Sequence, residues 1–152
     1  MANQITPPTL FTHNFQIKHV IATLILDNDS QKNIVAQTLV DTLHLPTTPH
    51  PAPYELGWVQ KYGPQIMVSQ RCIVTFSIGA FHDNILCDVS SLDCADLILG
   101  LSYQQQRHVV YHVKNQQYHL QHNGCTYVLT SSPPQMAQVV HLSSPTPKLS
   151  LH

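Results

Sequence analysis

The sequence predicts a mainly-β domain that carries one or two short helices. Apolar and mostly polar residues alternate over 66–78, which is the period of a strand with one buried face. Asn123-Gly124 separates two further strand-like segments and is a strong signal for a hairpin turn. A single segment shows clear helical spacing. The 152 residues are enough for one domain with a hydrophobic core.

The first predicted strand and helix lie in the N-terminal third of the chain. Ile21 to Leu26 is an apolar run broken only by Thr23, and turn-forming residues follow it. The helix is predicted from apolar residues spaced i, i+3, i+4 and i+7, namely Ala36, Leu39, Val40 and Leu43. Pro46 ends it. Because Thr47 to Pro53 holds three prolines, we expect an extended loop there.

The remaining elements are predicted strands joined by turns. The strand at 66–78 ends at Gly79-Ala80, and its partner returns through the alternating residues Ile85, Cys87 and Val89. Leu97-Ile98-Leu99-Gly100 is a second short apolar run that ends in glycine. The last hairpin joins Tyr118 to His122 with Cys125 to Leu129.

Composition sets the predicted domain limits. Residues 1–13 are polar and contain two prolines, so we predict a flexible tail. Residues 131–152 are rich in Ser and Pro and cannot bury enough apolar surface to offset the entropy of ordering, which predicts disorder. The folded domain is therefore expected at 14–130.

Charge and cysteine content exclude several functions. Charged residues make up 10% and the net charge is −1, so we expect neither a nucleic-acid partner nor an anionic membrane, since both attract basic patches. The sequence contains no apolar run long enough to cross a bilayer and no signal-peptide pattern, which favours the cytoplasm. The four cysteines are expected as free thiols, and without a Cys-x-x-Cys pair a structural zinc site is not expected.

An ordered series of segments resembles the retropepsin family, the single-domain aspartic proteases of retroviruses and gypsy-class retrotransposons. The similarity is closest to plant retrotransposon polyproteins, and it covers about residues 17–130. It is carried by Asp27 after the first strand and by the segments LVDTLHLPTTPHPAPY (39–54), LGWV (56–59), RCIVTFSIG (71–79), ILCDV (85–89) and CADLILG (94–100).

The resemblance implies a closed acid-protease β-barrel, an activity and a site. Asp27 would be the catalytic aspartate, and Asn28, Asp29 and Ser30 would complete its loop. The second apolar-Gly motif would be Ile98, Leu99 and Gly100, while Trp58, Val59 and Gly63 would lie in a flap or substrate groove. Since one chain supplies one such loop, the enzyme would be a homodimer through the active-site loops that cleaves a peptide or polyprotein without cofactor or metal.

The active-site loop departs from the family pattern, and two interpretations of Asp27 stay open. The family has Asp-Ser-Gly or Asp-Gly-Gly where this chain has Asp27-Asn28-Asp29, and Gly-Arg-Pro is common where this chain has Gly100 followed by Leu-Ser. Asp29 adds a charge near the dimer axis, where carboxylates repel. Asp27 is therefore either half of a catalytic dyad or part of a helix N-cap region in a catalytically decayed remnant that acts at most as a dimerisation or peptide-binding module.

Other candidate residues have simpler interpretations. His108 and His112 are four apart, a spacing that chelates metal on a helix, but Val109 to Val113 has the character of a strand and we expect surface histidines. Trp58 fits a groove or a packed core equally well. Cys87 and Cys94 could form a redox pair, although small buried cysteines are more common.

Overall fold

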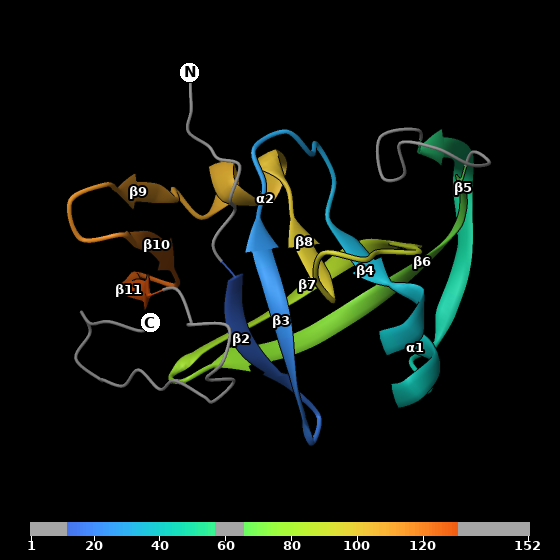
Figure 1. The fold of residues 1–152 in the computed structure, drawn as a ribbon, viewed down its shortest axis with the longest axis horizontal. Coiled ribbons are helices and arrows are strands. Elements are labelled where there is room, and N and C mark those ends of the chain that lie inside the picture. The colour runs from blue at the N-terminus through green and yellow to red at the C-terminus, as the bar shows by residue number, and fades with distance from the viewer. Residues whose placement is uncertain (1–11, 57–65, 131–152) are drawn as a thin grey trace.

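A computed structural model describes residues 12–56 and 66–130 and shows a mainly-β protein (Figure 1). Ten strands and two short helices form over these residues. In chain order they are β2 (Thr12–Ile17), β3 (Val20–Leu26), β4 (Ile34–Ala36), α1 (Gln37–Leu43), β5 (Thr47–Leu56), β6 (Ile66–Ile78), β7 (Phe81–Ser90), β8 (Leu97–Leu99), α2 (Leu101–Gln106), β9 (Val110–His112), β10 (Gln117–His122) and β11 (Cys125–Thr130).

The strands close into a barrel. Neighbouring strands follow the order β2-β3-β8-β4-β7-β6, and β6 returns to β2 where Gln16 pairs with Ser77. The pairs β3–β8 and β4–β7 are parallel and the others antiparallel, while β5 adds to the free side of β6. The predicted mainly-β closed barrel with short helices is therefore confirmed.

The order of β3, β8 and β4 brings two distant loops together. In the parallel register, Leu26 at the end of β3 lies beside Leu99 at the end of β8. The chain then returns as β4, which pairs with the other side of β8 through Ile34 and Ile98. The residues that follow β3 and β8 consequently meet at one end of the barrel.

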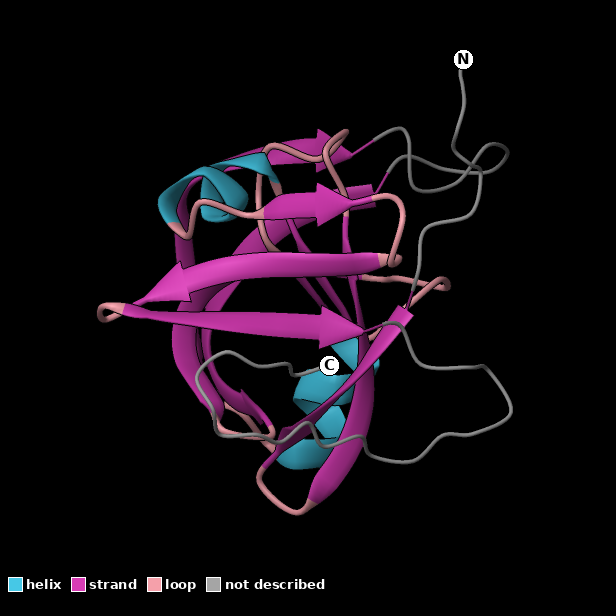
Figure 2. Ribbon diagram, turned by 90° about the vertical axis from the view of Figure 1, so that its left-hand side faces the viewer, coloured by secondary structure: helices cyan, strands magenta, loops and turns pink. Residues whose placement is uncertain are grey.

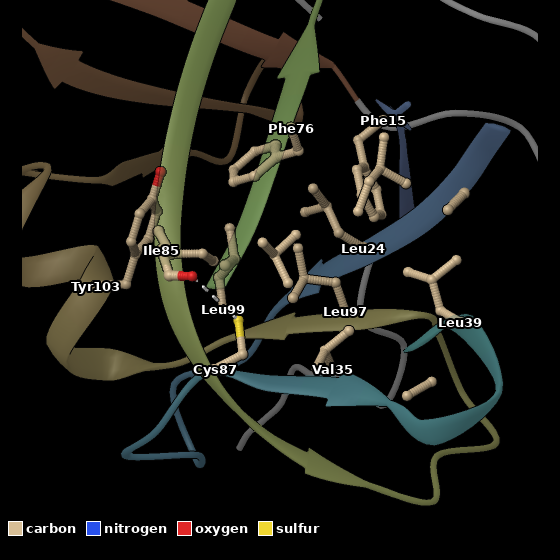
Figure 3. Close-up of a cluster of buried hydrophobic side chains, with 14 of the residues drawn as sticks. Phe15, Leu24, Val35, Leu39, Phe76, Ile85, Cys87, Leu97, Leu99 and Tyr103 are labelled. Carbon is tan, nitrogen blue, oxygen red and sulfur yellow. Dashed lines mark hydrogen bonds between the residues drawn. The ribbon is translucent and has the colours of Figure 1, made fainter. Parts of the chain in front are cut away.

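Alternating side chains fill the barrel with one main core (Figure 3). Leu24 and Val74 are fully enclosed, as expected from their places in apolar or alternating segments. The predicted helix is confirmed as α1, whose Leu39, Val40 and Leu43 are buried. It ends at His44, which adopts a left-handed conformation two residues before the proline.

A three-stranded antiparallel sheet, β11-β10-β9, lies beside the barrel (Figure 2). Its β10–β11 hairpin turns at Asn123 and Gly124, both with positive φ, as the sequence predicts. Leu120 and Leu129 attach this sheet to the main core. Arg107, which follows α2, forms a bidentate ion pair with the buried Asp83 of β7, with hydrogen bonds of 2.8 and 2.9 Å.

The expected loop over Thr47 to Pro53 is wrong, because β5 spans these residues. Prolines cannot donate to a sheet ladder, and they are tolerated in β5 because it is an edge strand that pairs with β6 on one side. Its register breaks between Pro49 and Tyr54, where the prolines cluster. Three elements were not recognised in the sequence: β2, β4 and α2 each span six residues or fewer.

The predicted domain limits stay predictions. β2 begins at Thr12, inside the segment predicted as a tail, and residues 1–11 and 131–152 lie outside the described part of the chain. All four cysteines are free thiols; Cys87 is buried and Cys94 is exposed. No helix within residues 12–56 and 66–130 has the length and apolar character that a membrane span requires.

Candidate active site

Asp27 lies directly after β3 at the end of the barrel. Its backbone N–H donates to the Leu99 carbonyl over 3.0 Å, so the ladder between β3 and β8 continues one residue beyond β3. Its side chain is largely buried, with 9% of the residue exposed. A buried strand thus delivers one carboxyl to the barrel rim in a fixed position.

Backbone groups of the following turn hold the Asp27 carboxyl. Its Oδ1 accepts a 2.9 Å hydrogen bond from the backbone N–H of Asp29, and its carbonyl accepts a 3.2 Å bond from the N–H of Ser30. This pattern is an Asx-type turn, in which the aspartate side chain binds the backbone two residues on. Asn28 and Asp29 are exposed, whereas Ser30 is buried.

Asp29 stands where the family that the sequence resembles has glycine, yet its backbone requires no glycine here. The non-glycine residues with positive φ are Lys18, His44, His108, Gln116 and Asn123 in the described part of the chain, and Asp29 is not among them. Its contact with Asp27 uses the backbone N–H, which any residue except proline provides. An aspartate is therefore accommodated at this position without a left-handed backbone, and it adds a charge to the loop.

The pKa of Asp27 is raised. Burial has the largest effect, because it disfavours the charged carboxylate. The hydrogen bond from the Asp29 backbone lowers this pKa, and the negative charge of Asp29 raises it again. A carboxyl with a raised pKa holds its proton more readily than an exposed aspartate, which suits a group that shares a proton.

Gly100 packs against the backbone of the Asp27 loop. A Cβ at this position would lie 2.5 Å from the Lys32 carbonyl oxygen and 2.7 Å from that of Ser30, too close for any side chain. The Gly100 N–H donates to Asn33 Oδ1 over 2.9 Å. The structure thus brings the predicted second motif against the predicted loop, and Gly100 is required for their close approach.

Helix α2 secures the loop on its other side. The Leu101 N–H donates to the Ser30 carbonyl over 2.7 Å, and Ser102 Oγ donates to the Gln31 carbonyl over 3.1 Å. The buried Gln104 amide donates to the Leu99 carbonyl over 3.0 Å. The Leu-Ser pair stands where Arg-Pro is common in the family that the sequence resembles, and it contributes its own contacts to the loop. Asn33 and Gln104 were not singled out in the sequence, because an isolated amide carries no recognisable pattern.

A hollow of about 460 Å³ opens beside Asn28. We call it the Asn28 hollow; its wall includes Asn28, Leu101, Gln105, Val110, Tyr111 and Tyr118. It therefore lies between the Asp27 loop, α2 and the β9–β10 pair.

A second polar cluster joins β5 to the loop that follows Asp27. The Tyr54 hydroxyl donates to the Asp88 carboxylate, and His50 Nε2 lies 3.4 Å from the same carboxylate. The Lys32 ammonium lies 4.7 Å from the centre of the Tyr54 ring. Burial, together with the Asp88 charge, raises the pKa of the Tyr54 hydroxyl far above its ordinary value. These residues hold the edge strand against the rim that carries Asp27.

The other candidate residues have different positions. Trp58, Val59 and Gly63 lie outside the described residues. His112, on β9, and His119, on β10, stack with ring centres 3.8 Å apart, while His108 precedes β9 in a left-handed turn. Within residues 12–56 and 66–130, no three side chains of His, Cys, Asp or Glu gather in a metal-binding arrangement.

Comparison with known proteins identifies the architecture. No family model and no curated protein matches the sequence. Among solved structures, the retroviral protease-like domain of Ddi1 from Leishmania major is similar with a TM-score of 0.59 and 12% identity, over 84% of this chain and 97% of that one. An identity this low establishes the fold alone. Together with the closed barrel and the paired loops at its rim, this similarity shows that the chain has the retropepsin-like fold.

Proposed function

We propose that this protein is an aspartic endopeptidase domain that works as a homodimer, with Asp27 of each chain forming one half of the catalytic pair. The observation that carries the proposal is the Asp27 carboxyl at the barrel rim. It is delivered by β3, oriented by the Asp29 backbone N–H, and shifted by burial toward its protonated form. The neighbouring retroviral protease-like fold supports the same reading.

The chemistry requires two carboxyls around one water. When two carboxyls face each other, both cannot ionise cheaply, so the pair retains one proton and titrates as a unit. The ionised Asp27 takes a proton from the water as it attacks the peptide carbonyl. The protonated Asp27 of the other chain gives its proton to the carbonyl oxygen. The first Asp27 then passes the proton that it took from water to the leaving nitrogen as the C–N bond breaks, and the second Asp27 takes back a proton from the hydroxyl of the intermediate as the carbonyl re-forms.

The substrate proposed here is an extended peptide within a polyprotein. By its resemblance to gypsy-class plant retrotransposons, the chain would process the polyprotein of its own element, and it would do so in the cytoplasm. Trp58, Val59 and Gly63 are proposed to contact the peptide from a flap that excludes water when it closes. The Lys32–Tyr54–Asp88 contacts would support this function by holding β5, the strand that precedes those residues.

A second candidate function is a catalytically decayed remnant that retains the fold and acts at most as a dimerisation or peptide-binding module. The observation that favours it is the exposed Asp29 side chain, whose charge already raises the pKa of Asp27 within one chain. A dimer would place two Asp27 and two Asp29 carboxyls near one axis. Their repulsion would weaken the dimer, or it would raise the pKa values of the two catalytic carboxyls until both hold a proton.

Cleavage of a peptide library near pH 5 distinguishes the two candidates. We expect cleavage that pepstatin inhibits and that Asp27→Asn lowers by about 10²–10⁴-fold, the usual contribution of a positioned acid or base. Asp29→Gly is the companion variant, because it removes the extra charge from a position whose backbone tolerates either residue. No cleavage by a confirmed dimer, with activity recovered in Asp29→Gly, would support the decayed form.

A further inference from the structure

Two of the four free cysteines face each other across the β6–β7 hairpin. Cys72 of β6 and Cys87 of β7 are direct partners in an antiparallel register that runs without a break to the turn. Directly opposed residues of an antiparallel pair have their side chains on the same face of the sheet. The sequence allows a redox pair of Cys87 with Cys94, whereas the register gives Cys87 a different partner.

Both thiols lie in the main core. Cys72 is 2% exposed and Cys87 is 1% exposed, and the next inward pair along the hairpin, Val74 and Ile85, is buried as well. Figure 3 shows the Cys87 sulfur among the apolar side chains of this core. Cys72 is close enough to raise the pKa of the Cys87 thiol electrostatically. The two sulfurs therefore share one buried site.

The spacing of the two strands suits a disulfide between Cys72 and Cys87. Directly opposed residues have Cα atoms about 4.5 or 5.5 Å apart, according to whether the pair is hydrogen-bonded. A disulfide spans Cα separations of about 4.4–6.8 Å, which includes both values. The bond can thus form by side-chain rotation and a small approach of the strands, while the register of the hairpin is kept.

We propose that Cys72 and Cys87 form a latent cross-strand disulfide, which oxidised glutathione closes when the β6–β7 hairpin opens locally. The Cys72 thiolate attacks one sulfur of oxidised glutathione, and one glutathione thiolate leaves. The Cys87 thiolate then attacks the Cys72 sulfur of this mixed disulfide and expels the second glutathione thiolate. The two cysteines lose two electrons and two protons, and one oxidised glutathione becomes two reduced glutathiones.

Local opening is required because burial protects both thiols in the closed barrel. The attacking species in disulfide exchange is the thiolate. Burial raises the pKa of Cys72, and it raises that of Cys87 well above its ordinary value, so thiolates are scarce while the hairpin is closed. In a reducing compartment the pair therefore stays as free thiols, and it closes only when an oxidant meets an open hairpin.

The disulfide would cross-link the strands that support β5. Cys87 directly precedes Asp88, whose carboxylate accepts the hydrogen bond from the Tyr54 hydroxyl, and Cys72 pairs with Thr47 of β5. A covalent bond beside both contacts joins β6 to β7 and restricts the unfolded chain. Oxidation would therefore stabilise the barrel, whether or not the domain cleaves peptides.

Treatment of the full chain with oxidised glutathione tests the proposal. The background variant Cys94→Ser with Cys125→Ser removes the two exposed thiols and leaves the core pair to react. Its mass should fall by two hydrogens, and faster in urea below the unfolding midpoint than in buffer, because urea favours opening. Peptide mapping of the oxidised wild type should join a peptide that contains Cys72 to one that contains Cys87.

The melting temperature shows whether the bond strengthens the fold. We expect oxidation of the background variant to raise it by about 10 °C, and dithiothreitol to reverse the rise. Cys87→Ala in the same background is the matched control, since it keeps Cys72 and should gain neither the bond nor the stability. The comparison of oxidised with reduced background protein does not depend on how well this control folds.

Four results would overturn the proposal. The first is an unchanged mass after oxidation in urea, and the second is a glutathione adduct at Cys72 that never resolves into a disulfide. The third is a wild-type bond that joins Cys87 to Cys94. The fourth is a Cys72–Cys87 bond that leaves the melting temperature unchanged or lower. None of these measurements uses peptidase activity, so they decide the disulfide separately from the proposed function.

Discussion

His13 provides a quantitative prediction, because it is an ionisable side chain inside the core. It lies on β2, 2% exposed, and its ring packs edge-on against Tyr118. Nδ1 donates to the Thr130 carbonyl over 3.3 Å, while Nε2 is buried with no partner in the described part of the chain. Burial lowers the pKa of His13 to about 4 from its ordinary 6.5, and the bond to Thr130 opposes this only in part.

This shift makes folding sensitive to acid in a defined range. Above pH 6.5 the imidazole is neutral in the folded and the unfolded chain, so it contributes no pH dependence. Between 6.5 and about 4 the unfolded chain binds a proton that the folded chain does not, so stability falls as the pH falls. A difference of about 2.5 pKa units corresponds to about 3 kcal/mol of stability lost across that range.

The variant His13→Phe isolates this effect. Phenylalanine keeps a ring against Tyr118 and removes the proton-binding site, while the lost bond to Thr130 costs about 1 kcal/mol at every pH. Urea unfolding of both proteins, from pH 7 to pH 4, gives the difference in their free energies of unfolding. We expect that difference to move by about 3 kcal/mol in favour of the variant as the pH falls.

The control is His82→Phe, which removes an exposed imidazole from β7. Its stability should follow the wild type at each pH. If His13→Phe and the wild type lose stability in parallel between pH 7 and pH 4, His13 does not resist protonation and its assigned environment is wrong.

Three further predictions concern the loop and its support. Gly100→Ala forces a Cβ against the Lys32 carbonyl and should lower the free energy of unfolding in urea by about 1–3 kcal/mol, with the proposed peptidase activity lost in parallel. An unchanged unfolding midpoint would contradict the close approach of Gly100 to the loop. Asp83→Asn breaks the buried pair with Arg107 and should cost about 3 kcal/mol at pH 7. The ion pair lowers the pKa of Asp83, although burial opposes this. The stability lost in the variant should therefore vanish at a pH low enough to protonate the Asp83 carboxyl of the wild type. Asp27→Asn should raise the melting temperature at pH 7 but not at pH 3. Above its ordinary pKa, Asp27 ionises readily in the unfolded chain, whereas the folded chain opposes that ionisation and loses stability. Calorimetry at both pH values checks this.

Elements with a strong local pattern could be predicted from the sequence. β6 is thirteen residues of alternating burial, and α1 buries the leucines and valine that its spacing indicates. The β10–β11 turn requires positive φ at two positions, and Asn-Gly adopts this conformation at little energetic cost. These elements are encoded by neighbouring residues, so a single sequence reveals them.

Elements that depend on distant partners could not be predicted in the same way. β5 contains three prolines and is a strand only because β6 offers one side for pairing. β4 is three residues long and is defined by its position between β7 and β8. The residues that support Asp27, such as Asn33 and Gln104, are ordinary amides whose contacts exist only after the barrel closes.

The most direct test of the account counts inhibitor molecules per chain. A pepstatin-type transition-state analogue should occupy one site between two Asp27 carboxyls, so calorimetric titration of the wild-type dimer near pH 5 should give one inhibitor for every two chains. Asp27→Asn should bind none. A ratio of one inhibitor per chain, or no binding by a wild type that sediments as a dimer, would contradict the claim that two copies of Asp27 form one catalytic site.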